Sequence, residues 1–107
     1  MNCFDDHNKT YVVLTTEADK KNAHRIANIL LEEKLTPCVS FNNIESSFWW
    51  EGEITQSEEV QLIIKCKENN LNKLLNKISE SHSYQVPEII YFPVKASNDY
   101  HHWLSSF

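Results

Sequence analysis

The sequence is poor in the residues on which several classes of protein depend. Among its 107 residues are a single arginine, Arg25, and 15 acidic side chains against 10 basic ones. Proteins that bind nucleic acid usually carry a basic surface rich in arginine, so we expect no nucleic-acid partner. The three cysteines, Cys3, Cys38 and Cys66, form no C-x-x-C pair. That pattern argues against a disulfide framework or a zinc knuckle and predicts free thiols in a reducing compartment.

Long apolar runs and targeting signals are also missing. The longest apolar run, residues 89–94, includes Pro93 and falls far short of the roughly 20 residues that a membrane helix needs. The start of the chain has no basic segment followed by an apolar one, as a signal peptide would have. We therefore expect a cytoplasmic protein with no membrane partner.

What is present is typical of one globular domain. Apolar residues make up 41% of the chain and charged residues 23%, and 107 residues suffice for one core but not for two. Residues 1–9 are polar and without pattern, which predicts a flexible N-terminal tail. Residues 10–107 are then expected to form a single domain.

Three segments have the spacing of amphipathic helices. In each, apolar residues recur at positions i, i+3, i+4 and i+7, which form one face of a helix. The three stripes are Ala23, Ile26, Ala27 and Leu30; Leu71, Leu74, Leu75 and Ile78; and Tyr100, Trp103, Leu104 and Phe107. The expected caps are side chains that favour helix starts, namely Thr16 with Asp19 as a capping box, Asn69 or Asn70, and Asn98 or Asp99.

The remaining segments are expected to be strands. Residues 10–16 are β-branched and aromatic, and two long extended arms, 36–50 and 53–66, meet at Glu51-Gly52. Gly52 is the only glycine of the chain. A tight hairpin needs a backbone with φ > 0, which glycine adopts without a clash. We therefore predict a long central hairpin with its turn at this glycine.

Two tryptophans lie beside the predicted turn. Trp49 and Trp50 are consecutive, and consecutive residues of a strand point to opposite faces. We expect one of them to pack on its own domain and the other to reach beyond it.

The order of elements is β-α-β-β-α-β with a short C-terminal helix. This order predicts the α+β ferredoxin-like fold, a four-stranded antiparallel sheet with two helices on one face. The last strand is nevertheless apolar on both faces, because residues 89–94 read IIYFPV. A second apolar face has to be covered, and another copy of the chain is the simplest cover. The long hairpin would then serve as an interlocking arm.

Five segments, in this order and spacing, carry a resemblance to a known family: YVVLTT, ILLEEKLTPCVS, FWWEGEI, EEVQLIIK and HSYQVPEIIYFPV. Together they span about residues 10–104 and resemble the CutA family, the divalent-cation tolerance proteins. The most specific pieces are Trp50-Glu51-Gly52, Glu59 with Lys65, and the run from His82 through Tyr84 and Pro87 to Glu88. The resemblance implies a compact homotrimer, similar to the trimers of PII signalling proteins, in which the subunits share strand edges around an axis.

The resemblance also implies tolerance of copper and other divalent metals, with a site made of one cysteine and two adjacent histidines. Those positions hold Thr15, Ser81 and His82, so only the second histidine matches. A hydroxyl is a poor ligand for Cu(I), and one imidazole alone makes a weak site. We therefore expect weak or relocated copper binding and assign no certain cofactor, with copper or another divalent cation as the candidates. His82 is a metal ligand, a proton switch or a polar group satisfied at a subunit boundary, and we favour the last.

Charged side chains on a largely apolar strand face need partners. Glu59 and Lys65 share one face of their strand. They can form salt bridges between subunits, which we slightly favour, or line a polar pocket at a subunit boundary. The candidate residues of that pocket are Trp50, Glu59, Lys65, His82, Tyr84 and Glu88.

Other reactive side chains are expected to be structural. Cys38 and Cys66 lie in predicted strands and suit the core. His101 and His102 are about 100° apart around a helix and are expected to be solvated. Cys3 and His7 lie in the predicted tail, where we give metal binding little weight.

These observations favour a non-enzymatic homotrimer that acts in divalent metal tolerance and binds a metal ion or small ligand at its subunit clefts. The alternative is a small-molecule or nucleotide sensor related to the PII proteins. Phosphates are usually met by glycine-rich loops or basic clusters, and this chain has one glycine and one arginine. No catalytic set has a spacing that supports an enzyme, and the acidic segment 16–19 would repel phosphate.

Overall fold

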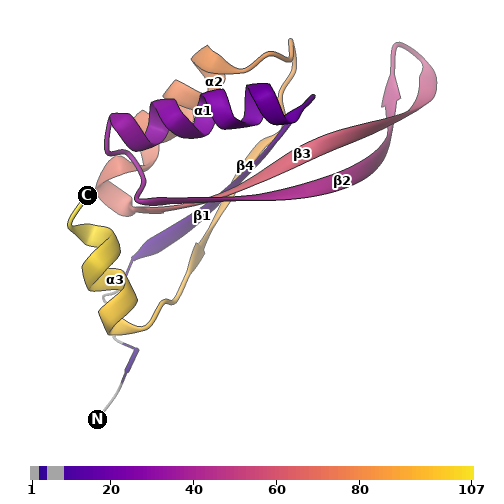
Figure 1. Ribbon diagram of the computed structural model, residues 1–107. Helices are drawn as coiled ribbons and strands as arrows, with labels where there is room; N and C mark the ends of the chain where they lie inside the picture. Colours follow the sequence, from indigo (N-terminus) through magenta and orange to yellow (C-terminus); the bar gives the residue numbers. More distant parts are fainter. Residues whose placement is uncertain (1–2, 5–8) are drawn as a thin grey trace.

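The computed structural model describes residues 3–4 and 9–107, and the described part of the chain forms four strands and three α-helices (Figure 1). In chain order these are β1 (Thr10–Glu17), α1 (Lys20–Glu32), β2 (Cys38–Trp50), β3 (Glu53–Lys67), a 3-10 turn (Glu68–Asn70), α2 (Leu71–Ser81), β4 (Ile89–Val94) and α3 (Asn98–Ser105). Most of the predicted tail, with His7, lies outside the described residues, and its flexibility stays a prediction. The carbonyl of Cys3 accepts a hydrogen bond from the amide of Asn98 at 2.7 Å.

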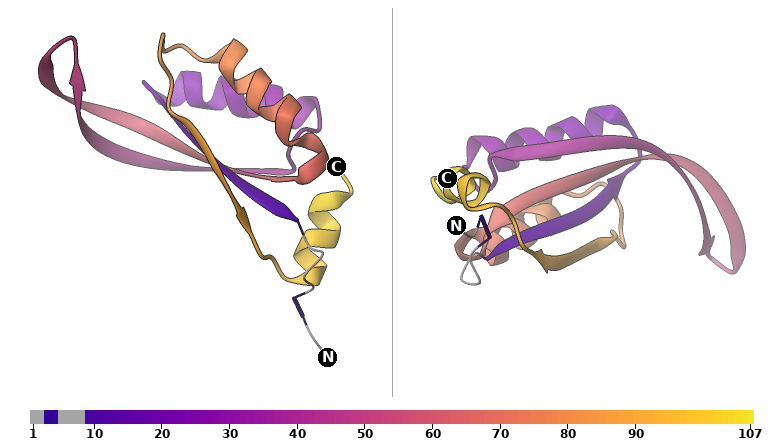
Figure 2. Two further views of the ribbon diagram at one scale, coloured as in Figure 1. Left: turned by 180° about the vertical axis from the view of Figure 1, so that it is seen from behind. Right: turned by 90° about the horizontal axis from the view of Figure 1, so that it is seen from below.

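The strands form one antiparallel sheet in the order β2-β3-β1-β4. α1 and α2 lie side by side over one face of this sheet, and α3 lies at one end of the molecule, away from them (Figures 1 and 2). This arrangement confirms the predicted α+β ferredoxin-like fold.

The core fills the space between the sheet and the layer of α1 and α2. Its members are buried apolar side chains from both layers: Val13, Ala23, Ile26, Ala27, Leu30, Leu35, Val60, Leu62, Ile64, Cys66, Leu71, Leu74 and Ile78. The predicted stripes of α1 and α2 face this core, although Leu75 is only partly buried. Burying each large aliphatic side chain contributes about 1.5–3 kcal/mol, so this layer is the main source of stability. Burial also raises the pKa of the Cys66 thiol to about 11.

The helix caps differ from the predicted ones. Asp19 caps α1 by itself, because its carboxylate accepts a hydrogen bond from the amide of Asn22 at 2.8 Å. The predicted capping box has Thr16 as the cap and Asp19 as its partner, but the strand continues through Glu17 and holds Thr16 within the sheet. Ser97 caps α3 in place of Asn98 or Asp99. Each cap is therefore set by where the neighbouring element ends.

Asn70 begins α2 at the predicted place but does not cap it. Its side-chain amide donates to the carbonyls of Lys34, Leu35 and Phe107 instead. The residue thereby ties the start of α2 to the end of α1 and to the C-terminus.

α3 covers one end of the second sheet face. Leu104 is buried there, and Lys67 donates to the carbonyl of Ser105 at 3.0 Å. The ring of His101 lies 2.9 Å from the hydroxyl of Thr10. The prediction that His101 is solvated is therefore wrong, because α3 packs against the start of β1.

The rest of the second face is open in a single subunit. Ile90 of β4 is 47% exposed, and Phe92 on the same face is also exposed. Tyr91, on the other face of β4, is exposed as well. The predicted apolar surface on both faces of the last strand is thus present.

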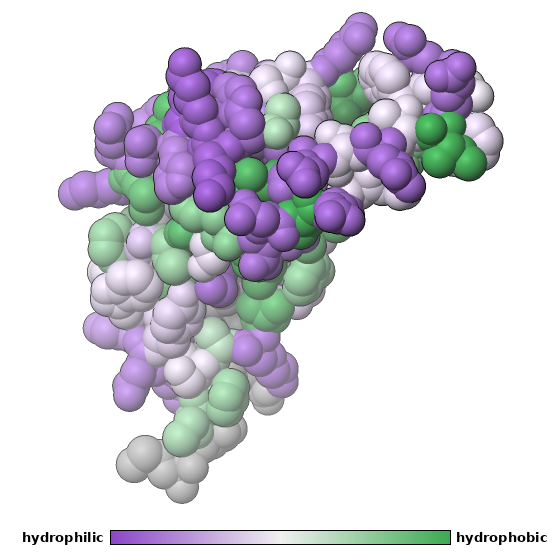
Figure 3. Space-filling model, turned by 45° about the vertical axis from the view of Figure 1, so that its right-hand side comes forward, coloured by the Kyte–Doolittle hydropathy of each residue, from purple (hydrophilic) through white to green (hydrophobic). Residues whose placement is uncertain are grey.

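The hairpin of β2 and β3 projects from the body as a long arm (Figure 1). Glu51 and Gly52 form its turn with φ of 49° and 80°, so both central residues are left-handed, as in a type I′ turn. Trp49 is 71% exposed and Trp50 is 44% exposed. The expectation that one tryptophan packs on its own domain is wrong for the single subunit, because the tip extends past every other element. Hydrophobic surface shows at the end of the arm in Figure 3. Ile54, which pairs with Trp49 beside the turn, is 68% exposed.

Gly52→Val should weaken the hairpin. Apart from Gly52 itself and its two chain neighbours, no atom of the described residues lies within 4 Å of a Cβ placed at this glycine, so the cost comes from the left-handed backbone. We expect a loss of about 1–2 kcal/mol in the free energy of unfolding, measured by chemical denaturation. The matched control is Glu51→Asn, which should keep wild-type stability because asparagine tolerates positive φ. Equal stability of Gly52→Val and wild type would contradict the prediction.

Candidate functional site

Three consecutive residues after α2, the 82–84 loop, dock onto the end of β1 and the middle of β3. The contacts in chain order are His82 with Thr15, Ser83 with Glu17 and Tyr84 with Glu59. α2 stops at Ser81 because the next residue adopts an extended backbone that turns the chain toward the sheet. Arg25 of α1 donates to the carbonyl of Ser81 at 2.7 Å and so satisfies one of the carbonyls left at the helix end.

Glu17 is the buried carboxylate of the site. Its side chain has no exposed surface. It accepts hydrogen bonds from the amide of Ser83 at 2.9 Å, from the Ser83 hydroxyl, and from the amide of Ala18 at 3.1 Å. A buried charge needs such donors, so this carboxylate fixes the loop at the end of β1.

The hydrogen bonds of His82 define its tautomer. The amide of Tyr84 donates to Nδ1 at 3.0 Å, so Nδ1 carries no proton. Nε2 then holds the ring proton and donates to the hydroxyl of Thr15 at 3.1 Å. Nδ1 is also 3.5 Å from a carboxylate oxygen of Glu17, but a neutral ring makes no ion pair there. The fully buried imidazole is therefore a neutral bridge between β1 and the loop.

Tyr84 links the loop to β3. Its hydroxyl donates to a carboxylate oxygen of Glu59 at 2.6 Å, and its ring lies 5.1 Å from the ring of His82. Burial, followed by the hydrogen bond and the charge of Glu59, raises the pKa of Tyr84 well above its usual range. The phenol therefore stays protonated and remains a donor.

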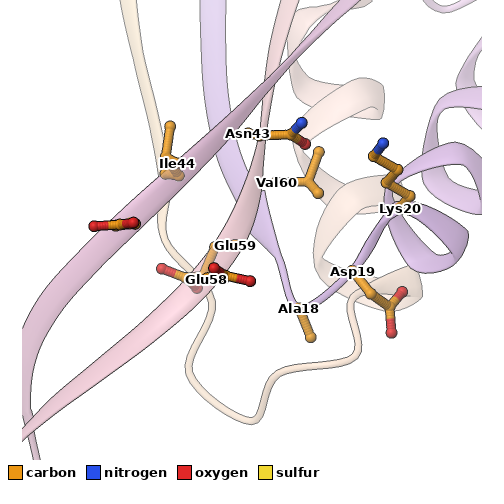
Figure 4. Close-up of a pocket in the computed structure, with 9 residues that line it drawn as sticks. Ala18, Asp19, Lys20, Asn43, Ile44, Glu58, Glu59 and Val60 are labelled. Atoms are coloured by element: carbon orange, nitrogen blue, oxygen red, sulfur yellow. The ribbon is translucent and has the colours of Figure 1, made fainter.

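An open groove of about 730 Å³ lies beside this contact, between the start of α1 and the hairpin arm (Figure 4). Its lining residues are Ala18, Asp19, Lys20, Asn43, Ile44, Glu45, Glu58, Glu59 and Val60. The lining includes four carboxylates and one ammonium group, which makes the groove negative. It therefore favours cationic over anionic ligands.

One subunit brings together only part of the predicted pocket. Tyr84 contacts both His82 and Glu59. Lys65 lies six residues from Glu59 along β3, about 20 Å at the rise of a strand. Trp50 lies at the hairpin tip. A pocket that joins these residues needs other subunits, so it stays a prediction.

The remaining predicted pocket residue, Glu88, is exposed just before β4.

Sequence reasoning missed Glu17 and Ser83. A usable signal was the parity of β1, where residue 17 continues the face of Val13 and Thr15 that the helices cover. A carboxylate in that position must find donors inside the protein.

Among the described residues, no three His, Cys, Asp or Glu side chains are grouped so that they could hold a metal ion. Within the same part of the chain, no helix combines the length and the apolar character that crossing a membrane requires.

Comparison with known proteins identifies close relatives. Residues 11–106 match the family described as CutA1 divalent ion tolerance protein. A divalent-cation tolerance protein CutA of Pyrococcus horikoshii is 37% identical over 94 residues, covering 87% of this chain and 92% of that protein. Protein CutA 1, chloroplastic, of Oryza sativa subsp. japonica is 39% identical over 97 residues, and the match spans 55% of its length.

The same likeness holds in three dimensions. The crystal structure of CutA1 from Oryza sativa superposes with a TM-score of 0.84 at 39% identity, covering 90% of both chains. The structure of CutA from Synechococcus elongatus gives a TM-score of 0.88 at 28% identity, covering 94% of this chain and 91% of the other.

Glu59→Gln should lower the pKa of Tyr84. The substitution removes a negative charge and a charged hydrogen-bond acceptor, both of which raise this pKa, while burial remains. We expect the pKa to move toward the ordinary value of 10 but to stay above it. Ultraviolet absorbance during a pH titration measures it, with Tyr84→Phe identifying the signal.

Glu58→Gln is the matched control, because Glu58 lines the same groove but is not one of the carboxylates that raise the pKa of Tyr84. It should leave the titration of Tyr84 unchanged. A raised folded-state pKa favours the protonated phenol, so this stabilisation is present below about pH 10 and is lost as the pH rises through the folded-state value. An unchanged titration in Glu59→Gln would contradict the role given to this carboxylate.

Proposed function

The chain belongs to the CutA1 divalent ion tolerance protein family, and we propose that it works as a non-enzymatic homotrimer in tolerance of divalent metal ions such as copper. The observation that carries this proposal is the pair of surfaces that one subunit leaves uncovered. These are the open sheet face around Ile90 and the hairpin arm with its exposed tryptophans. Apolar surface of this extent is typical of an interface.

Trimeric assembly is supported by the geometry of the sheet. The strand order puts β2 and β4 at the two edges. Exposed edges invite further strand pairing, and a closed ring of subunits removes that risk. The arm extends the molecule to 53 Å along its longest axis, against 26 and 21 Å along the others. An arm of this length can reach across a neighbouring subunit.

The groove supports the assignment to metal tolerance over the alternative of a nucleotide sensor. Its four carboxylates and one lysine disfavour a phosphate group. The single arginine, Arg25, is already engaged with Asn22 and the carbonyl of Ser81. A PII-like nucleotide sensor would need a basic cluster at this position.

A structural role for the polar site supports a function without catalysis. The Ser83 hydroxyl donates to Glu17, His82 bridges Thr15 and Tyr84, and each of these contacts holds the loop. Groups that are committed to such bonds within the fold are not available as nucleophile or base without breaking it.

Ile90→Asp should break the trimer. A carboxylate on the covered face would be buried without a partner, which disfavours association strongly. Sedimentation equilibrium should report three times the 12.6 kDa chain mass for wild type and a smaller particle for the variant.

Leu31→Asp provides the matched control. Leu31 is 39% exposed on α1, comparable with the 47% of Ile90, but lies on the helix layer. We expect it to keep the wild-type mass. A wild-type protein that sediments as a stable monomer would rule out the trimer.

Metal tolerance is tested in a bacterium that becomes copper-sensitive when its own family member is deleted. Wild-type protein should restore growth in copper, and Ile90→Asp should restore it less at equal protein level. Failure of the wild-type chain to restore growth, despite normal expression and assembly, would count against the proposed function.

A further inference from the structure

We infer that the residues at the implied copper-ligand positions, Thr15, Ser81 and His82, do not form a metal site in this chain. They instead anchor the 82–84 loop without a metal ion. His82 is a positioning residue that sets Tyr84 against Glu59, and it does not bind a metal ion. This goes beyond the proposed function, because it states that metal tolerance in this chain does not run through His82.

The lone pairs of the site are already used. A neutral imidazole has one nitrogen lone pair available to a metal, and at Nδ1 it accepts the amide hydrogen of Tyr84. Nε2 carries the proton that it donates to Thr15. An ion at either nitrogen must break one of these bonds and also reach a side chain with no exposed surface.

The other two implied ligand positions, Thr15 and Ser81, do not supply the copper ligands that His82 cannot provide. Thr15 is fully buried, and its hydroxyl is bonded to the imidazole. Thr15 and Ser81 supply hydroxyl groups, which are harder donors than the thiolate and imidazole that copper prefers. The guanidinium of Arg25 lies on the carbonyl of Ser81, which adds positive charge beside the position. The residues present therefore do not fit a copper ion.

The same bonds explain what the position does instead. The bond from the Tyr84 amide to Nδ1 spans only two residues and holds the loop in a tight turn. Glu17 holds the residue between them through the amide and hydroxyl of Ser83. Because His82 and Ser83 are both held in place, the phenol of Tyr84 reaches Glu59 at the edge of the groove. Loss of the anchor should therefore loosen one wall of the groove.

The first experiment measures metal binding to the full chain. Cu(I) and Zn(II) are titrated in competition with a chelator of known affinity against wild type, His82→Ala and, as a control, His102→Ala, which removes an exposed histidine. We expect the two variants to differ from wild type by less than about twofold in affinity, with the same stoichiometry. Loss of a tight equivalent in His82→Ala alone would overturn the inference.

The second experiment measures the anchor by amide hydrogen exchange. In His82→Ala the Tyr84 amide loses its acceptor, and its exchange should speed up by about tenfold. His82→Asn offers a carbonyl oxygen close to the place of Nδ1 and should keep most of the protection. Core amides such as that of Leu30 should exchange as in wild type, which shows that the effect is local. Unchanged Tyr84 exchange in His82→Ala would refute the anchor.

The tautomer gives a test that needs no variant. Nitrogen chemical shifts of the wild-type ring should show a proton on Nε2 and none on Nδ1, and one equivalent of Zn(II) should leave them unchanged. A zinc-dependent shift of the Nδ1 or Nε2 resonance at one equivalent would show that the ring is a ligand.

Discussion

Two helices can cover only one face of a four-stranded sheet, and most features of this molecule follow from that constraint. The face beneath α1 and α2 becomes the core. The other face receives α3 at one end and remains open around Ile90. Because β4 is apolar on both faces and the hairpin arm projects from the body, the single subunit leaves apolar surface uncovered. The proposed trimer is the form in which these surfaces are covered.

The parts of the fold that could be predicted are those encoded by local periodicity. Leu74 and Ile78 repeat at helical spacing and are both buried in the structure. The turn at Gly52 follows from a single residue whose backbone freedom the hairpin requires, and its φ of 80° confirms that reading. Such signals need no knowledge of what packs against them, so sequence alone carries them.

The features that could not be predicted depend on where a distant segment docks. His101 is held beside Thr10, 91 positions away, only because α3 folds under the start of β1. Glu17 is buried because the 82–84 loop supplies its donors from 66 positions away. The parity of β1 indicates that Glu17 faces the helix layer. Neither that parity nor the helical periodicity around His101 contains information about which distant segment supplies the hydrogen-bond partner. The resemblance to a family pointed to His82, but it could not show which bonds the ring makes.

Contacts within one subunit and contacts between subunits have different roles in the proposed function. The loop contacts lie within one subunit, so they set the shape of the groove before any assembly. Two of the nearby carboxylates, Glu17 and Glu59, are committed to Ser83 and Tyr84 and hold that shape. The groove as a whole keeps an excess of negative charge, which attracts cations through its field. A field does not select among ions, because selection requires ligands that converge at a fixed distance. In the proposed trimer, selectivity for one metal would therefore have to come from groups that converge between subunits.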